Sequence, residues 1–80
     1  MKMNYYKVDR DTYSDIINHF TTFLIDKTKN YEIGDLINLQ IIVGEDKAKS
    51  TTTLLKIINI YENIEALKDG YCIIGFVELK

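Results

Sequence analysis

The feature that most constrains the fold of this chain is an alternating run of apolar and polar side chains at residues 36–43. A period of two puts the two sets on opposite faces of a strand, as a half-buried antiparallel strand requires. The residues on the apolar face are Ile37, Leu39, Ile41 and Val43, and those on the polar face are Asn38 and Gln40. The segment before it, Tyr31–Asp35, contains Gly34, which adopts a positive φ at little cost. We therefore expect a turn at 31–35 that leads into the longest regular strand of a sheet.

Before this turn, the sequence predicts a short strand, a helix and a second strand. The strand is expected at 5–8, where side chains alternate and two are aromatic. Apolar residues then recur at helical spacing, which predicts one main amphipathic helix at about 10–19. The members of this apolar stripe are Tyr13, Ile16, Ile17 and Phe20. Asp9 or Asp11 is expected to cap the helix, and the second strand is expected at 21–27.

After the alternating run, the sequence predicts a charged hairpin loop at 44–50 and two further strands. The strand at 51–62 is long enough to need a bend or a bulge, and burial on both faces would explain the adjacent Ile57 and Ile58. A helical turn is expected at 63–69, closed by Gly70, and the last strand at 71–79. The predicted fold class is α+β, in one domain over residues 1–80: a curved, largely antiparallel sheet or partial barrel of about five strands with one main helix.

Composition narrows the classes of function. The net charge is −2 with a pI near 5.2, so the chain has no general attraction for nucleic acid, and any basic face must be local. Cys72 is the single cysteine, which excludes an internal disulfide and metal sites built on paired cysteines. We expect a cytoplasmic protein with no membrane segment, no cofactor and no metal site.

Four segments together carry a family resemblance. The chain resembles the ASCH-type branch of the PUA-like superfold, close to short phage-associated ASCH-like proteins of unknown function. The segments that resemble this group are 22–27 (TFLIDK), 31–39 (YEIGDLINL), 54–60 (LLKIINI) and 67–76 (LKDGYCIIGF). The resemblance implies a PUA-like or ASCH-like curved sheet.

The resemblance also implies a pocket that binds RNA or modified nucleosides and, in some members, hydrolyses an amide on a cytosine base. Family members place a glycine, a lysine, a glutamate and an arginine around the helix end and the second strand. The matching positions here are His19, Phe20 or Thr21, Leu24 and Asp26, and of the polar set Thr22 alone is retained. Leu24 supplies no group for proton transfer, and Asp26 reverses the charge of an arginine.

We therefore expect a non-catalytic binding module for RNA, DNA or a nucleotide-like ligand, with its groove between the helix end and the second strand. The expected binding residues are Lys7, Thr22, Asp26, Lys27, Lys29 and Tyr31. Two alternatives stay open: a phage-type accessory protein that binds and modulates a host protein, and an amidohydrolase acting on acylated bases. The sequence also leaves open a monomer or a dimer paired through a strand edge.

Several single residues have a structural and a functional interpretation. His19 is expected in a left-handed turn at the helix end, and Cys72 as a small buried residue, not a reactive thiol. Tyr13 and Tyr71 are assigned to the core. Tyrosines also stack on bases when they line a surface, and this role is left open for Tyr5, Tyr6 and Tyr31.

Overall fold

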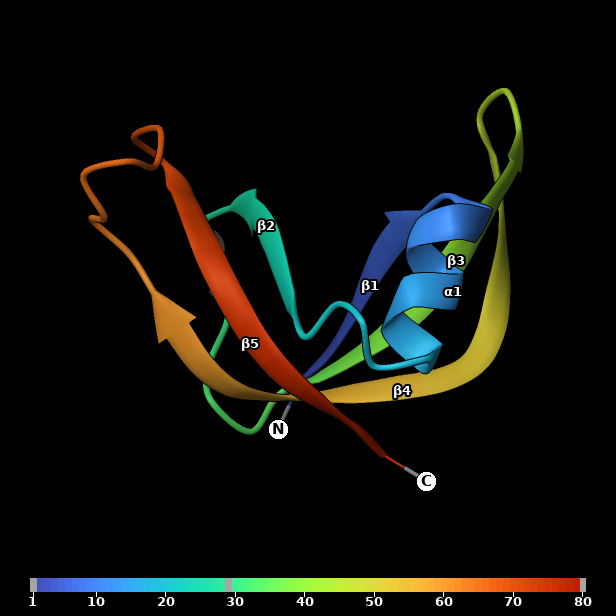
Figure 1. Cartoon of the computed structure of the whole chain (residues 1–80), viewed down its shortest axis with the longest axis horizontal. Coiled ribbons are helices and arrows are strands. Elements are labelled where there is room, and N and C mark those ends of the chain that lie inside the picture. The colour runs from blue at the N-terminus through green and yellow to red at the C-terminus, as the bar shows by residue number, and fades with distance from the viewer. Residues whose placement is uncertain (1, 29, 80) are drawn as a thin grey trace.

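The computed structural model describes residues 2–28 and 30–79, which form one helix and a five-stranded sheet (Figure 1). In chain order the elements are β1 (Met3–Val8), α1 (Arg10–Ile17), β2 (Phe23–Lys27), β3 (Leu36–Gly44), β4 (Lys47–Tyr61) and β5 (Tyr71–Leu79). The α+β class with one helix and a curved sheet is confirmed.

The sheet has the strand order β1-β3-β4-β5-β2 and is mixed. Three of its pairs are antiparallel, but β1 runs parallel to β3, with Tyr6 opposite Leu39. Since β1 and β2 are the two ends of this order, the curved sheet remains open between them. The parallel pair was not predicted, because the chain returns to β3 only after passing through α1 and β2.

The turn before β3 connects three parts of the sheet. The Asp35 side chain is buried and accepts hydrogen bonds from the backbone amides of Lys2 and Glu32, both at 3.0 Å. Its own backbone carbonyl accepts from the Ile57 amide at 2.9 Å, and the Gly34 amide donates to the Ile57 carbonyl at 2.8 Å. Gly34 has φ +97°, a left-handed conformation that glycine adopts readily. This turn therefore fixes β1 and β4 beside the start of β3.

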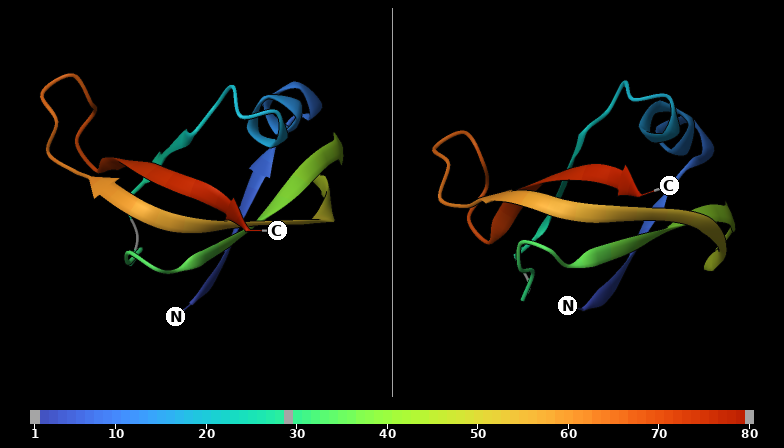
Figure 2. Two further views of the ribbon diagram at one scale, coloured as in Figure 1. Left: turned by 60° about the horizontal axis from the view of Figure 1, so that its bottom comes forward. Right: turned by 90° about the horizontal axis from the view of Figure 1, so that it is seen from below.

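The core lies on the concave side of the sheet, where α1 covers one end (Figure 2). Ile16 is the buried residue of the helix, and the Tyr13 hydroxyl lies 2.6 Å from the Thr53 hydroxyl of β4. The turn before β3 contributes Tyr31 to the apolar core. The sheet contributes the rest: Val8, Leu24, Ile37, Leu39, Leu55, Ile57, Cys72, Ile74 and Phe76.

The helix is shorter than predicted. Asp9 caps it by accepting from the Thr12 amide at 2.7 Å, but the helix ends at Ile17 and His19 turns left-handed with φ 64°. The conformation predicted for His19 is thus confirmed. Phe20, which was assigned to the apolar stripe, is 82% exposed because the chain has already left the helix.

Other boundaries also shift. The loop expected at 44–50 is a tight hairpin, since β4 already begins at Lys47, and β2 begins at Phe23. Residues 63–69 form turns without a helix, although Gly70 does adopt the expected left-handed conformation, with φ 85°. Along β3 the apolar face is buried at Ile37 and Leu39, but Val43 is 49% exposed where the hairpin extends beyond the core.

The predicted irregularity in the fourth strand is a bulge. The register of β4 against β5 shifts between Ile57 and Asn59, so one extra residue is inserted there. Ile57 is fully buried while Ile58 is 41% exposed. The bulge, and not burial on both faces, explains the two adjacent isoleucines.

Candidate ligand-binding site

The two edges of the open sheet approach each other at β1 and β2. The Tyr6 side chain of β1 reaches across, and its hydroxyl donates to the Ile25 carbonyl of β2 at 2.8 Å. The Lys2 carbonyl accepts from the Leu36 amide of β3. Because alternate residues of a parallel strand face the same neighbour, the backbone groups of Tyr5 and Lys7 point away from β3 toward the open edge.

A cavity of about 400 Å³ lies at this open edge. We call it the slot, and its lining residues are Tyr5, Tyr6, Lys7, Asp26 and Gln40. Lys7 lies opposite Gln40 in the β1–β3 register, and both belong to the outer face of the sheet. Tyr5 is 59% exposed, so its ring is accessible to a ligand.

Asp26 is held in place by its neighbours. Its side chain accepts from the Tyr31 hydroxyl at 2.6 Å and from the Lys27 amide at 2.8 Å. Burial of Tyr31, its hydrogen bond to Asp26 and the charge of that carboxylate raise the pKa of the Tyr31 hydroxyl far above its ordinary value. Burial, followed by the charge of Asp26, also raises the pKa of Tyr6. At neutral pH both hydroxyls are therefore neutral hydrogen-bond donors, that of Tyr31 to Asp26 and that of Tyr6 to the Ile25 carbonyl.

The structure does not bring all of the expected binding residues together. Lys7 and Asp26 line the slot together. Tyr31 and Lys27 contact Asp26, Tyr31 through its buried side chain and Lys27 through its backbone amide. Thr22 lines a different hollow, and Lys29 lies outside the described residues.

Sequence reasoning missed Gln40 as a slot residue. Its place in the alternating run correctly predicted that it lies opposite the core face. Its position beside Lys7 follows from the parallel pairing of β1 with β3, which no local pattern indicates. Tyr5 and Tyr6 had been left open, and both line the slot.

The hollow that contains Thr22 lies where the helix end meets β5. It measures about 230 Å³, and its lining residues are Ile16, His19, Thr21, Thr22, Phe76, Val77 and Glu78. The groove was expected between the helix end and the second strand, but the other wall of this hollow is β5. Asp26 and Lys7 line the slot and not this hollow.

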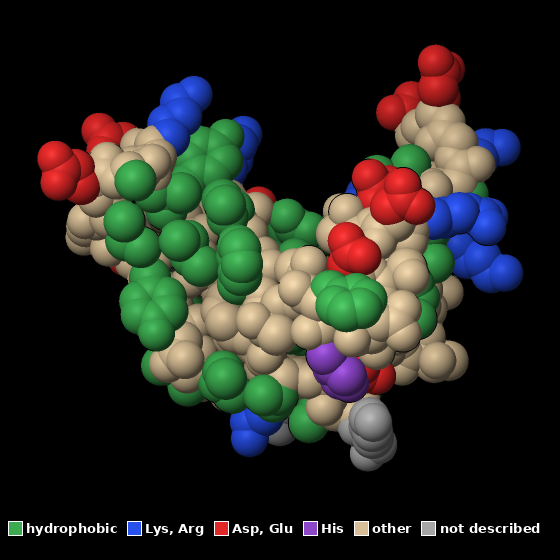
Figure 3. All heavy atoms as spheres, in the orientation of Figure 1, with side chains coloured by type: hydrophobic (Ala, Val, Ile, Leu, Met, Phe, Trp, Pro, Cys, Tyr) green, Lys and Arg blue, Asp and Glu red, His purple; other side chains and the backbone are tan. Residues whose placement is uncertain are grey.

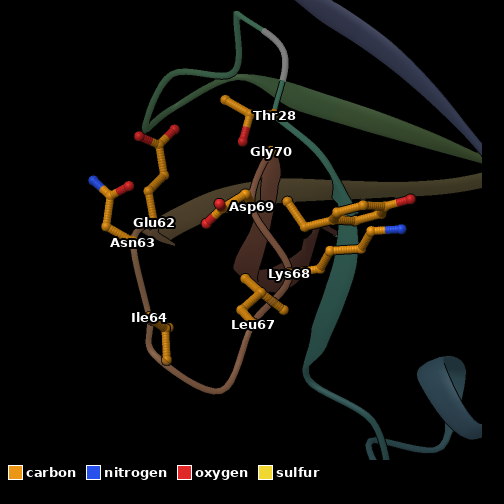
Figure 4. A pocket seen from close by; sticks show the side chains of 9 residues that line it. Thr28, Glu62, Asn63, Ile64, Leu67, Lys68, Asp69 and Gly70 are labelled. Carbon is orange, nitrogen blue, oxygen red and sulfur yellow. The ribbon is translucent and has the colours of Figure 1, made fainter.

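A third hollow, of about 210 Å³, lies in the loop between β4 and β5 (Figure 4). Glu62, Asp69 and Lys68 line it together with Thr28. Within residues 2–28 and 30–79, no three His, Cys, Asp or Glu side chains form a group that could hold a metal ion. The loop hollow thus offers scattered charges and no defined coordination site.

The other residues with two interpretations are also placed. Cys72 is 1% exposed, which confirms its assignment as a buried residue. Tyr13 packs against the core as expected. Tyr71 does not: it lies half-buried, with Lys68 over its ring at 6.0 Å. Tyr31, at the start of the turn at 31–35, lies in the core instead.

Comparison with known proteins adds no relative. No protein-family model matches the chain, and no curated protein matches it. In the described part of the chain, no helix has the length and apolar character needed to cross a membrane.

Proposed function

We propose that this chain is a non-catalytic binding module, and that its slot takes a nucleotide-like ligand, either free or within RNA or DNA. The observation that carries the proposal is the convergence, in one cavity, of an exposed aromatic ring, a lysine and an amide side chain. These are Tyr5, Lys7 and Gln40. Each suits a different part of a nucleotide.

The roles follow from the chemistry of the groups. A base stacks on the Tyr5 ring, an interaction of about 1–3 kcal/mol per base by alanine substitution. Lys7 meets a phosphate as a compact positive charge. The Gln40 amide both donates and accepts, so it pairs with a base edge, and Asp26 favours a base that presents a donor.

Binding is favoured over amide hydrolysis by the surroundings of β2. Leu24 occupies the position of the glutamate in the proteins that the chain resembles, and its side chain is buried in the core. Both oxygens of Asp26 already accept hydrogen bonds, one from the Tyr31 hydroxyl and one from the Lys27 amide.

Calorimetric titration at low salt tests the proposal. The ligands are single- and double-stranded RNA and DNA and the four ribonucleoside monophosphates. We expect Tyr5→Ala and Lys7→Ala each to weaken binding by about 5-fold or more, from the loss of stacking or of a phosphate contact. The matched controls are Phe20→Ala and Lys56→Ala, which remove an exposed aromatic ring and an exposed lysine outside the slot.

Two results would contradict the proposal. One is the absence of binding for every ligand at high micromolar concentration. The other is binding that the two control substitutions weaken as much as the slot substitutions do. An acetylated cytidine, followed by chromatography, should be returned unchanged.

A further inference from the structure

The outer face of β2, β5 and β4 carries several exposed apolar side chains. We call it the outer patch, and its members are Phe23, Ile25, Ile58, Tyr61, Val77 and Leu79, each between 41% and 51% exposed. Figure 3 shows hydrophobic side chains gathered over β5 and the neighbouring strands.

The strand register explains why these side chains are adjacent. Ile25 of β2 lies opposite Ile73 of β5, and Ile73 lies opposite Tyr61 of β4. Phe23 lies opposite Gly75 in the same way. Core residues occupy the intervening positions and point to the concave side, so the outer patch is the second apolar face of strands that already bury their first.

The exposed area of the outer patch can be compared with the area that one partner buries in a dimer interface. With about 150–250 Å² for a whole aromatic side chain and somewhat less for an aliphatic one, its six members expose on the order of 500 Å². A standard interface buries about 800 Å² per partner, and a homodimer interface is about 65% apolar. The outer patch therefore supplies about the apolar area that one half of such an interface needs.

Few charged side chains lie on this face. Lys27 and Lys56 both point outward from it. Lys27 lies opposite Tyr71 at one end. Lys56 lies opposite Val77, between the pair of Leu54 with Leu79 and the pair of Asn59 with Gly75. Depletion of charged side chains is typical of the core of a protein interface.

We propose that the outer patch packs against the same patch of a second copy, which gives a face-to-face dimer. This goes beyond nucleotide binding and uses a different surface, because none of the six residues lines the slot. It also differs from pairing through a strand edge, since the outer patch consists of side chains on a sheet face and not of the backbone groups of an edge strand.

Sedimentation equilibrium of the full chain tests the dimer from about 1 μM to about 1 mM, which spans weak to moderate association. We expect the mass to rise from 9.3 kDa toward twice that value. Val77→Lys and Ile25→Lys should each raise the dimer dissociation constant at least about tenfold, because burying an unpaired lysine is costly. The matched control is Val43→Lys, an exposed valine in the β3–β4 hairpin, which should leave it unchanged.

Two outcomes would overturn the proposal. A wild-type mass of 9.3 kDa at every concentration would show that no second copy covers the outer patch. A dimer that persists in Val77→Lys would place the interface elsewhere, with a strand edge as the alternative. Circular dichroism of each variant checks the fold, and Ile25→Lys locates the interface if Val77→Lys does not fold.

Discussion

At the scale of single residues, Asp35 connects the start of the chain with the turn before β3. Burial alone would raise its pKa, but the amides of Lys2 and Glu32 donate to the carboxylate and the charge of Lys2 lies nearby. Together they hold the pKa of Asp35 below its ordinary value. A carboxylate fixed by two amides ties the start of β1 to the turn before β3, and the parallel pair depends on that contact.

We predict that Asp35→Asn lowers the midpoint of thermal unfolding at pH 7, because the amide presents a donor to groups that are already donors. Since the folded pKa is lowered, the contribution of Asp35 is present above its unfolded pKa of about 4 and is lost as the pH falls through the folded pKa. Wild type and variant should converge in acid. Asp11→Asn, on the exposed helix surface, is the control, and an equal effect there would contradict the role given to Asp35.

Tyr31 titrates at the other end of the pH scale. Its folded pKa is raised, so its contribution to stability is present below the unfolded value of about 10 and is lost as the pH rises above it. We predict that Tyr31→Phe reduces the free energy of unfolding in urea at neutral pH by about 1–2 kcal/mol, for the lost hydrogen bond to a carboxylate. The difference from wild type should shrink above pH 10. Tyr61→Phe, an exposed tyrosine, should have little effect at either pH.

At the scale of elements, the relation of β1 to β2 decides whether the slot exists. The described contact that joins them is the Tyr6 hydroxyl on the Ile25 carbonyl, and the same side chain lines the slot. β1 pairs with β3, and β2 pairs with β5, through regular backbone ladders. Across the open edge, a side-chain hydrogen bond therefore connects β1 with β2, and not backbone pairing.

We predict that Tyr6→Phe loosens this edge without unfolding the sheet. The lost hydrogen bond should cost about 0.5–1.5 kcal/mol. Amide hydrogen exchange should accelerate in β2 and remain unchanged in β3, whose two neighbours are unaffected. Equal acceleration in both strands would mean that the hydroxyl supports the whole fold and not the edge.

At the scale of the whole molecule, the sequence predicted the elements better than their arrangement. The period of two at Leu39 and its neighbours, the Asp9 cap and the left-handed His19 are local, and the structure confirms them. The length of the fourth strand likewise indicated a bend or a bulge, which the structure has at Ile58. The parallel β1–β3 pair, in contrast, depends on residues far apart in the chain. The same holds for the site. Lys7 and Asp26 were predicted as binding residues, but Gln40 lies beside Lys7 only because β1 pairs with β3.

The central claim is that the open edge of the sheet forms a nucleotide-binding slot. It is tested most directly by amide chemical-shift mapping of the full chain during titration with the nucleotide that binds best. We predict that the perturbed amides cluster at Tyr5, Tyr6, Lys7, Asp26 and Gln40. Shifts that instead centre on the Thr22 hollow or on the outer patch, or no shifts at millimolar ligand, would contradict the claim.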